Sequence, residues 1–278
     1  MNPKYRSLVD SLPKMSPLTM RMLRVLSKAS CSIGELADIA ERDAALSARI
    51  LRTANSATFG RFQPVTSLRD AISIQGVGLL RKFIVGASIT NLFSRTNTSR
   101  LFSILRFNLH SLATATLLEL MTDEIPVENS DQAFVAGMLH DVGELLIALN
   151  CPSEHEQILA LRAVSGDPQM ECERKILGID HAELSAMATT RWQLDDALTK
   201  VVANHHQAEL QNGFGDLKLS IALERADGFV NSLGLSILPP NAESLAQFDL
   251  EFPEFALPKE RLLKRFEGEW SKLNDLFQ

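Results

Sequence analysis

Five of the six histidines, together with two aspartates, are the residues of this sequence best suited to chemistry. His140–Asp141 lies in a very apolar run, and His205–His206 forms a second unusual pair. Neutral imidazole and carboxylate together suit iron, manganese, zinc or a similar divalent ion. The candidate metal ligands are His110, His140, Asp141, His181, His205, His206 and Asp227.

The His140–Asp141 pair indicates what such a site would do. Adjacent helical residues point about 100° apart, so the pair could straddle one ion or face two ions that share the carboxylate. A divalent ion polarises a phosphoryl oxygen and lowers the pKa of bound water, which suits phosphoester hydrolysis. A lone histidine is more often an ordinary core or surface residue, but a buried His–Asp pair needs partners. The sixth histidine, His155, lies in a polar stretch and is expected to be exposed.

Helices must position these residues, because apolar side chains recur at spacings of three and four along most of the chain. Few runs alternate with the period of two that half-buried strands show. The fold class is therefore predicted to be all-α. In the second half of the chain, helices are expected at residues 101–121, 131–149, 153–165, 168–177, 181–193, 195–204 and 217–233.

The first hundred residues are expected to form a helical bundle of their own. Ser32 and Glu35 have the spacing of a capping box, and Ser67 is a second expected N-cap. Asn55 or Ser56 is expected to close the helix before it. Helices in this part are predicted at residues 18–26, 44–54 and 79–93.

The carboxyl-terminal part is expected to be a proline-containing connector and one amphipathic helix. Leu262, Phe266, Trp270 and Leu273 form one stripe, which we expect to pack back on the body rather than bind a partner. The predicted parts are thus an amino-terminal bundle, a metal-site half, and the connector with its helix, at residues 1–100, 101–235 and 236–278.

Length and composition fit an ordinary globular protein. The 278 residues suit one large domain or two small ones, and 45% hydrophobic with 22% charged residues excludes disorder for most of the chain. No run suits a membrane span and no signal sequence begins the chain, so we expect a cytoplasmic protein without membrane insertion. Three widely spaced cysteines indicate reduced thiols rather than disulfides or a zinc knuckle.

The net charge of −6 is unevenly distributed along the chain. Residues 1–106 hold 16 Lys and Arg against 6 Asp and Glu, whereas residues 107–278 hold 12 against 28. This asymmetry fits a polyanion-binding half, or two parts that attract each other or a partner. Residues 35–52 are weakly similar to a helix-turn-helix, but their turn lacks glycine, so nucleic-acid binding is the least favoured function.

Several segments together resemble one known family. They include ARILRTANSATFG, FNLHSLATATLL, AFVAGMLHDVGELLI and VVANHH. This combination resembles the HDOD family, a branch of the HD superfamily of metal-dependent phosphohydrolases. The resemblance covers roughly residues 10–235 and implies an amino-terminal helical bundle packed on an HD-like helical half.

The resemblance also implies ligands for one or two divalent ions. The HD superfamily holds one ion with a His, an adjacent His–Asp pair and a later Asp, which match His110, His140, Asp141 and Asp227. The related HD-GYP cyclic di-GMP phosphodiesterases bind a second ion with further histidines, which match His181, His205 and His206.

Two departures separate this sequence from catalytic HD-GYP proteins. Those proteins carry HDxGK, whose lysine meets the substrate phosphate, whereas Glu144 takes the place of that lysine here. A carboxylate there would repel phosphate. No GYP-like motif follows His206. Both departures argue against cyclic di-GMP hydrolysis and leave the metal site intact.

Two functions follow from this resemblance. The leading one is a bacterial signalling or regulatory HDOD protein that keeps a metal site and binds a signalling protein partner. The alternative is a metal-dependent phosphohydrolase acting on a nucleotide or another phosphoester, with Asp141 and the water on its metal as the catalytic groups. A cyclic dinucleotide remains open as a ligand in either case.

Overall fold

The computed structural model describes residues 32–55, 64–76, 78, 80, 98–206, 217–238, 250 and 257–277. These residues form helices and connecting turns, and no β-strand occurs among them. An isolated bridge joins Val127 to Leu217. The predicted all-α fold is therefore confirmed. The helices expected at residues 18–26 and 79–93 fall outside the described residues or are described only in part.

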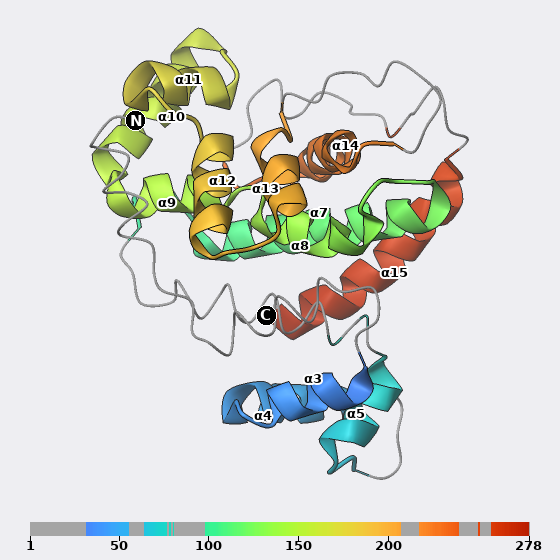
Figure 1. The fold of residues 1–278 in the computed structure, drawn as a ribbon. Coiled ribbons are helices and arrows are strands. Elements are labelled where there is room, and N and C mark those ends of the chain that lie inside the picture. The colour runs from blue at the N-terminus through green and yellow to red at the C-terminus, as the bar shows by residue number, and fades with distance from the viewer. Residues whose placement is uncertain are drawn as a thin grey trace.

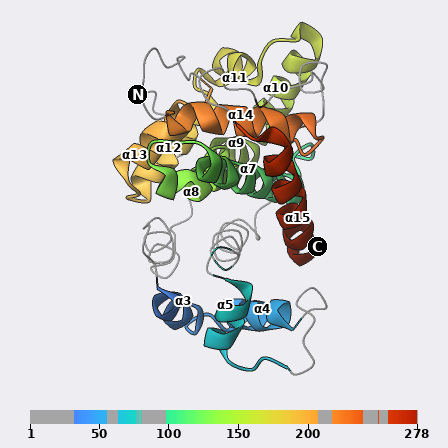
Figure 2. The same ribbon diagram turned by 90° about the vertical axis from the view of Figure 1, so that its right-hand side faces the viewer.

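The helices of the first part pack against one another. They are α3 (Ile33–Ala40), α4 (Ala44–Ala54) and α5 (Leu68–Gln75), and they lie together on one side of the molecule (Figures 1 and 2). Ser32 and Glu35 form the predicted capping box, and the Ser67 hydroxyl accepts from the N–H of the third residue after it.

Asn55 ties the end of α4 to the segment that precedes α5. Its Nδ2 donates to Leu51 O at 2.8 Å, and the Val65 N–H donates to Asn55 Oδ1 at 2.7 Å. The predicted closing residue thus also links the end of α4 to Val65, ahead of α5.

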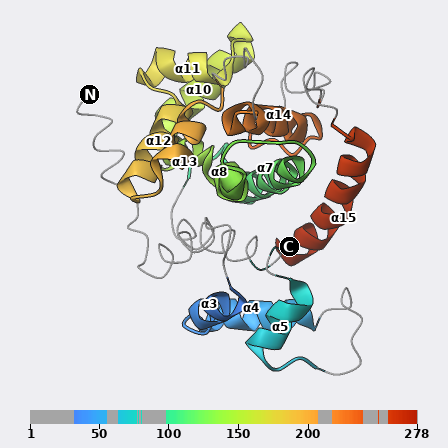
Figure 3. The ribbon, with the colours of Figure 1, turned by 45° about the vertical axis from the view of Figure 1, so that its right-hand side comes forward.

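The larger body is organised around one buried helix, α7. Figure 3 shows α7 beside α8, with α14 over them and α15 at one side. Nearly every face of α7 is apolar or small, which is typical of a helix enclosed by other helices. The helices of this body are α7 (Ile104–Glu124), the short 3-10 turn η2 (Ser130–Gln132), α8 (Ala133–Leu139), α9 (Val142–Asn150), α10 (Pro152–Ser165), α11 (Gln169–Leu177), α12 (His181–Arg191), α13 (Asp196–Ala203), α14 (Leu219–Ser232) and α15 (Lys259–Phe277).

The prediction of a single helix at residues 131–149 is wrong, because the helix is interrupted at the His140–Asp141 pair. α8 ends before His140, and α9 begins after Asp141, whose φ of −103° and ψ of 15° are not helical. The sequence is apolar on both sides of the break, so the spacing of apolar residues does not reveal the interruption of the helix. The whole stretch Ser130–Asn150 has the length and hydropathy of a membrane span, but 89% of its most apolar window is buried inside the protein.

Glycines allow the helices on each side of the break to approach their neighbours. A Cβ on Gly137 would overlap the backbone of Ala115 in α7, and a Cβ on Gly143 would overlap the carbonyl group of His181 in α12. The N–H of Gly143 also donates to Ser185 Oγ at 2.7 Å. These contacts hold the His140–Asp141 break between α7 and α12.

The last helix, α15, packs on α7 as its apolar stripe predicts. Leu262, Phe266 and Leu273 are buried. Beside them Arg265 pairs with Glu124 and Asp123 at 2.7 Å each, at the end of α7. The same helix that carries His110 is therefore held by a segment from the end of the chain.

His155 is buried, which corrects the expectation that it is exposed. Its Nδ1 lies 3.0 Å from Ser99 Oγ, and its ring meets Phe102 edge-on. α10 begins at Pro152, and its phase turns His155 inward while the polar neighbours that suggested exposure lie on its outer side. The free cysteines Cys151 and Cys172 are buried as well. Cys31 falls outside the described residues.

Candidate metal centre

A first set of four donor atoms converges where α7, α14 and the α8–α9 break meet. His110 Nε2 lies 3.1 Å from Asp227 Oδ1 and 3.3 Å from Asp141 Oδ2. His140 Nε2 lies 3.1 Å from Asp141 Oδ2 and 3.3 Å from His110 Nε2. All four side chains are buried, and these atoms lie within 4.8 Å of one another.

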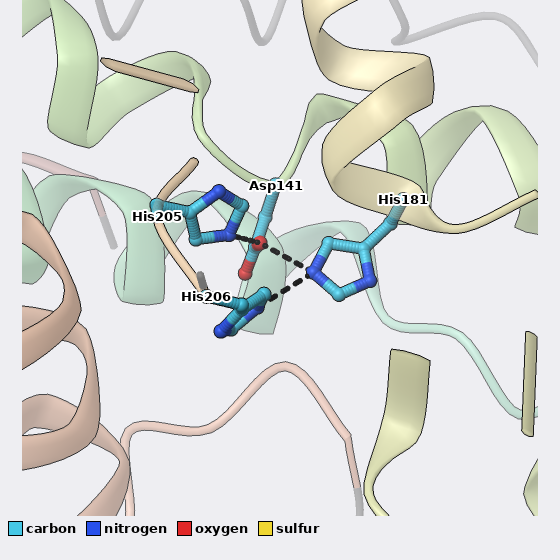
Figure 4. A group of neighbouring side chains, drawn as sticks. All are labelled: Asp141, His181, His205 and His206. Carbon is cyan, nitrogen blue, oxygen red and sulfur yellow. Dashed lines mark hydrogen bonds and ion pairs between the residues drawn. The ribbon is translucent and has the colours of Figure 1, made fainter. Parts of the chain in front are cut away.

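A second set of four donors, drawn in Figure 4, shares Asp141 with the first. Asp141 Oδ1 is 3.4 Å from His205 Nε2 and 3.5 Å from His181 Nε2. His181 Nε2 is also 2.8 Å from His206 Nε2. His181 opens α12, whereas His205 and His206 follow the end of α13, so the set combines two elements with the α8–α9 break.

Asp141 belongs to both sets, with one carboxylate oxygen in each. Oδ2 faces His110 and His140, and Oδ1 faces His181 and His205. The break in the helix at this residue places its carboxylate between the two groups of histidines. The arrangement has the form of two cation sites with a shared carboxylate.

Hydrogen bonds behind the rings orient four of the histidines. Backbone carbonyl oxygens lie near Nδ1 of three of them: Leu235 O for His110 at 2.9 Å, Gly137 O for His140 at 2.8 Å, and Val202 O for His205 at 2.6 Å. Nδ1 of His181 lies 2.7 Å from Glu173 Oε2. An acceptor at Nδ1 places the proton there, so the lone pair of each neutral ring is on Nε2, toward the centre.

This orientation fits a cation and suits the protein poorly without one. If both rings are neutral, two Nε2 lone pairs face each other 3.3 Å apart at His110 and His140. Asp141 Oδ1 and His205 Nε2 are buried and have no hydrogen-bond partner. Buried polar atoms normally have partners. Here imidazole and carboxylate atoms without such partners converge on one place. These are the donor groups that a divalent transition metal prefers.

The electrostatics of the first set also favour positive charge. Burial lowers the pKa of both histidines, but the carboxylates of Asp141 and Asp227 outweigh it and raise the pKa to about 9 for His110 and about 10 for His140. Burial would raise the pKa of each aspartate, but the adjacent histidines hold it well below its usual range. A cation bound there would meet two ionised carboxylates.

The second set differs in its charge. Burial lowers the pKa of His205, and burial with the neighbouring imidazoles lowers the pKa of His206. Burial also opposes protonation of His181, but Glu173 raises the pKa of that ring well above its usual range. Two of the three rings are therefore neutral, which is the form that binds metal.

Glu173 and Glu144 form a carboxyl pair behind His181. Glu173 accepts from both the backbone N–H of His181, at 2.8 Å, and its Nδ1. Glu144 Oε1 is 3.9 Å from the same Nδ1. Glu144 is buried, and burial, followed by the charges of Glu173 and Asp141, raises its pKa to about 8.

A pocket with a volume of about 510 Å³ opens onto these residues. It reaches Asp141 and Asp227 of the first set and His181 and His206 of the second. Its size lies within the range of small-molecule sites. The two donor sets are therefore accessible to a ligand from one side.

The structure brings all seven predicted candidate ligands into one centre. Glu173 and the backbone oxygens that orient the rings were not predicted. Gly137 and Val202 each lie three residues before the histidine they face, which is a local signal, but the contact between Glu173 and His181 depends on the packing of α11 against the start of α12.

The HDOD domain family matches residues 12–208 of this chain. The match spans more than half of the sequence, so the chain belongs to the HDOD domain family. It ends before Asp227, which the structure nevertheless places in the first donor set.

Solved structures with the same fold agree with this assignment. An HDOD domain protein with unknown function from Geobacter sulfurreducens is 23% identical, with a TM-score of 0.75 over 99% of this chain and 94% of that one. A "putative phosphohydrolase" from Shewanella amazonensis SB2B is 22% identical, with a TM-score of 0.72 over 99% and 98%. A "putative signal transduction protein" from Marinobacter aquaeolei VT8 is 18% identical, with a TM-score of 0.71 over 100% and 60%.

A curated relative is similar in sequence but has no assigned role. It is an uncharacterized protein of Treponema pallidum (strain Nichols), 19% identical over 198 residues. The match covers 71% of this chain and 38% of the relative, so the chain spans about two fifths of that protein's length.

Proposed function

We propose that this chain is a metal-dependent phosphohydrolase of the HDOD family that binds two divalent cations of iron, manganese or zinc. The cations would be held by His110, His140, Asp141 and Asp227, and by Asp141, His181, His205 and His206. The substrate would be a nucleotide or another phosphoester. The apolar stretch Ser130–Asn150 is buried in the core, which supports a protein without membrane insertion; the location would be cytoplasmic.

The observation that supports hydrolysis most is the pocket that reaches both donor sets. Structural metal sites are closed by protein ligands, whereas catalytic sites keep a position open. Asp141 and Asp227 line this pocket together with His181 and His206. For this reason we place hydrolysis ahead of the purely regulatory role that the sequence favours.

The residues of the chain have distinct tasks in this proposal. Divalent cations supply a polarised phosphoryl oxygen and a nucleophilic water near neutral pH. Asp141 fixes the two donor sets relative to each other, because each of its oxygens faces one set. Glu173 keeps the proton of His181 on Nδ1 and leaves Nε2 for the centre.

Turnover by the full chain loaded with manganese tests this proposal. The substrates are p-nitrophenyl phosphate and bis(p-nitrophenyl) phosphate, and the variant is Asp141→Asn, with Asp196→Asn, exposed on α13, as the matched control. We expect the first substitution to lower the rate by about 100-fold or more and the control to leave it unchanged. Equal rates in both variants, or no turnover by the manganese-loaded wild type, would contradict the proposal.

A regulatory role is the second candidate, with a signalling protein as partner. Two observations favour it: Glu144 replaces the lysine that meets phosphate in HD-GYP enzymes, and α3, α4 and α5 supply none of the donor atoms. This role predicts bound metal without turnover, and a cyclic dinucleotide that binds intact.

A further inference from the structure

The wall of the pocket beyond the donor sets has an acidic side. Glu144 from α9, Glu171 from α11 and Glu224 from α14 all line it. Arg174 and Arg162 line it as well: Arg174 pairs with Asp180 at 2.6 Å, and the charge of Arg162 acts to lower the pKa of Glu144, against the larger effects of burial and of Glu173. Bound cations would attract an anionic group to the donor sets, whereas a second anionic group would meet the carboxyl groups that line the rest of the pocket.

Glu144 has one carboxyl oxygen near His181 and one without a hydrogen-bond partner. Its side chain is 4% exposed, it lines the pocket, and its Oε2 has no hydrogen-bond partner. A buried carboxyl oxygen without a partner is costly. A ligand that donates a hydrogen bond, and best one that carries a positive charge, would remove this cost.

The position of Glu144 limits how long the ligand can be. Glu144 Oε1 is 3.9 Å from Nδ1 of His181, while Nε2 of the same ring faces Asp141. One imidazole ring therefore separates the carboxyl group from the second donor set. Met170, Ile237 and Leu238 also line the pocket and suit a short hydrocarbon chain.

We propose that the pocket selects a compact zwitterion, with a phosphoryl group at the metal end and an ammonium group a few carbon atoms away against Glu144. The proposal rests on the proposed metal-dependent function and adds the class of substrate to it. Glu144 is then a residue that determines specificity, because an ammonium group placed against it favours the ionised form of its carboxyl group.

Two isosteric phosphonates that cannot be hydrolysed as esters test this proposal by calorimetry. They are 3-aminopropylphosphonate and n-butylphosphonate, titrated into the full chain loaded with manganese, with inorganic phosphate as a reference. We expect the amine to bind at least about tenfold more tightly than its methyl counterpart. In Glu144→Gln, this preference should fall to about twofold or less, while the affinity for n-butylphosphonate stays within about twofold of wild type.

The outcomes separate this proposal from the one it rests on. If phosphate binds and the two phosphonates bind equally well to the wild type, selection of an amine is wrong and the metal-dependent function stands. If neither phosphate nor either phosphonate binds to metal-loaded protein, both proposals are wrong. If Glu144→Gln, with an unchanged thermal unfolding curve, keeps the full preference, Glu144 is not the group that recognises the amine. The wild-type comparison does not depend on how the variant folds.

Discussion

At the scale of single residues, the function of the centre depends on how each ring is held as much as on the donors themselves. The backbone oxygens behind three histidines cannot be removed by side-chain substitution. Glu173, which orients His181, can be substituted because the contact is made by its side chain. Glu173 is not a donor in either of the two sets that contain Asp141. It is therefore the best place to test the role of ring orientation.

Glu173→Gln should weaken metal binding without removing any donor of the two sets. Loss of the negative charge behind His181 lowers the basicity of Nε2, and substitutions of this kind cost about 10- to 100-fold in metal affinity. Titration of the chelator-treated chain with manganese or zinc measures the change. Glu156→Gln, exposed on α10, is the control. Unaltered affinity in Glu173→Gln would mean that this hydrogen bond does not support the site.

Gly143→Ala should destabilise the fold around the His140–Asp141 break. A methyl group there would overlap the carbonyl group of His181, so α9 and α12 must separate. Overpacking of this kind costs about 1–3 kcal/mol in the free energy of unfolding. Urea unfolding measures it. Gly268→Ala, on an open face of α15, is the control and should stabilise the chain by about 0.5–1 kcal/mol. Similar effects of the two substitutions would contradict the tight contact.

At the scale of helices, the contact between α10 and the segment before α7 contains a buried histidine that is sensitive to pH. Burial lowers the pKa of His155, and the opposing charges of Glu173 and Glu156 do not restore it. The ring is therefore neutral in the folded protein near neutral pH, where its Nδ1 lies 3.0 Å from Ser99 Oγ.

His155→Gln should make the stability of the chain less dependent on pH on the acid side. In wild type, the pKa of His155 is below its unfolded value of about 6.5, so the unfolded chain binds more protons and stability falls as pH drops below 6.5. One such group contributes at most about 1.4 kcal/mol per pH unit. Urea unfolding from pH 7.5 to 5 in both proteins measures it. Parallel pH profiles would show that His155 titrates alike in both states.

The sequence predicts most helices well because their signals are local. The helix expected at residues 44–54 is observed as Ala44–Ala54, and that at 153–165 as Pro152–Ser165. The break at His140–Asp141 lies beside a tertiary contact, the close approach of Gly143 to His181, and the apolar pattern of the sequence continues across it. The burial of His155 likewise depends on where Ser99 lies.

At the scale of the whole molecule, the candidate site draws on segments far apart in the chain. α7, the α8–α9 break, α12, the segment after α13 and α14 each supply at least one donor. The composition of the seven donors could be predicted from their types and from the resemblance to HD proteins. The resemblance also predicts their division between two ions. Which oxygen of Asp141 faces which ring required the fold, because residue spacing alone does not say it.

The part of the chain beyond the family match supports the same centre. Asp227 and the carbonyl of Leu235 both contact His110, and α15 packs along the helix that carries it. The HDOD match ends at residue 208. We therefore expect that the metal site needs the carboxyl-terminal part as well as the matched segment.

The metal content of the full chain, purified without chelator, tests the central claim most directly. Elemental analysis should find two equivalents of iron, manganese or zinc in wild type, about one in Asp227→Asn and about one in His206→Ala. Asp141→Asn should lose metal from both sites, because its two oxygens face both donor sets. A folded wild-type protein that holds no metal, even after loading, or variants that all keep two equivalents, would contradict a two-metal centre built on Asp141.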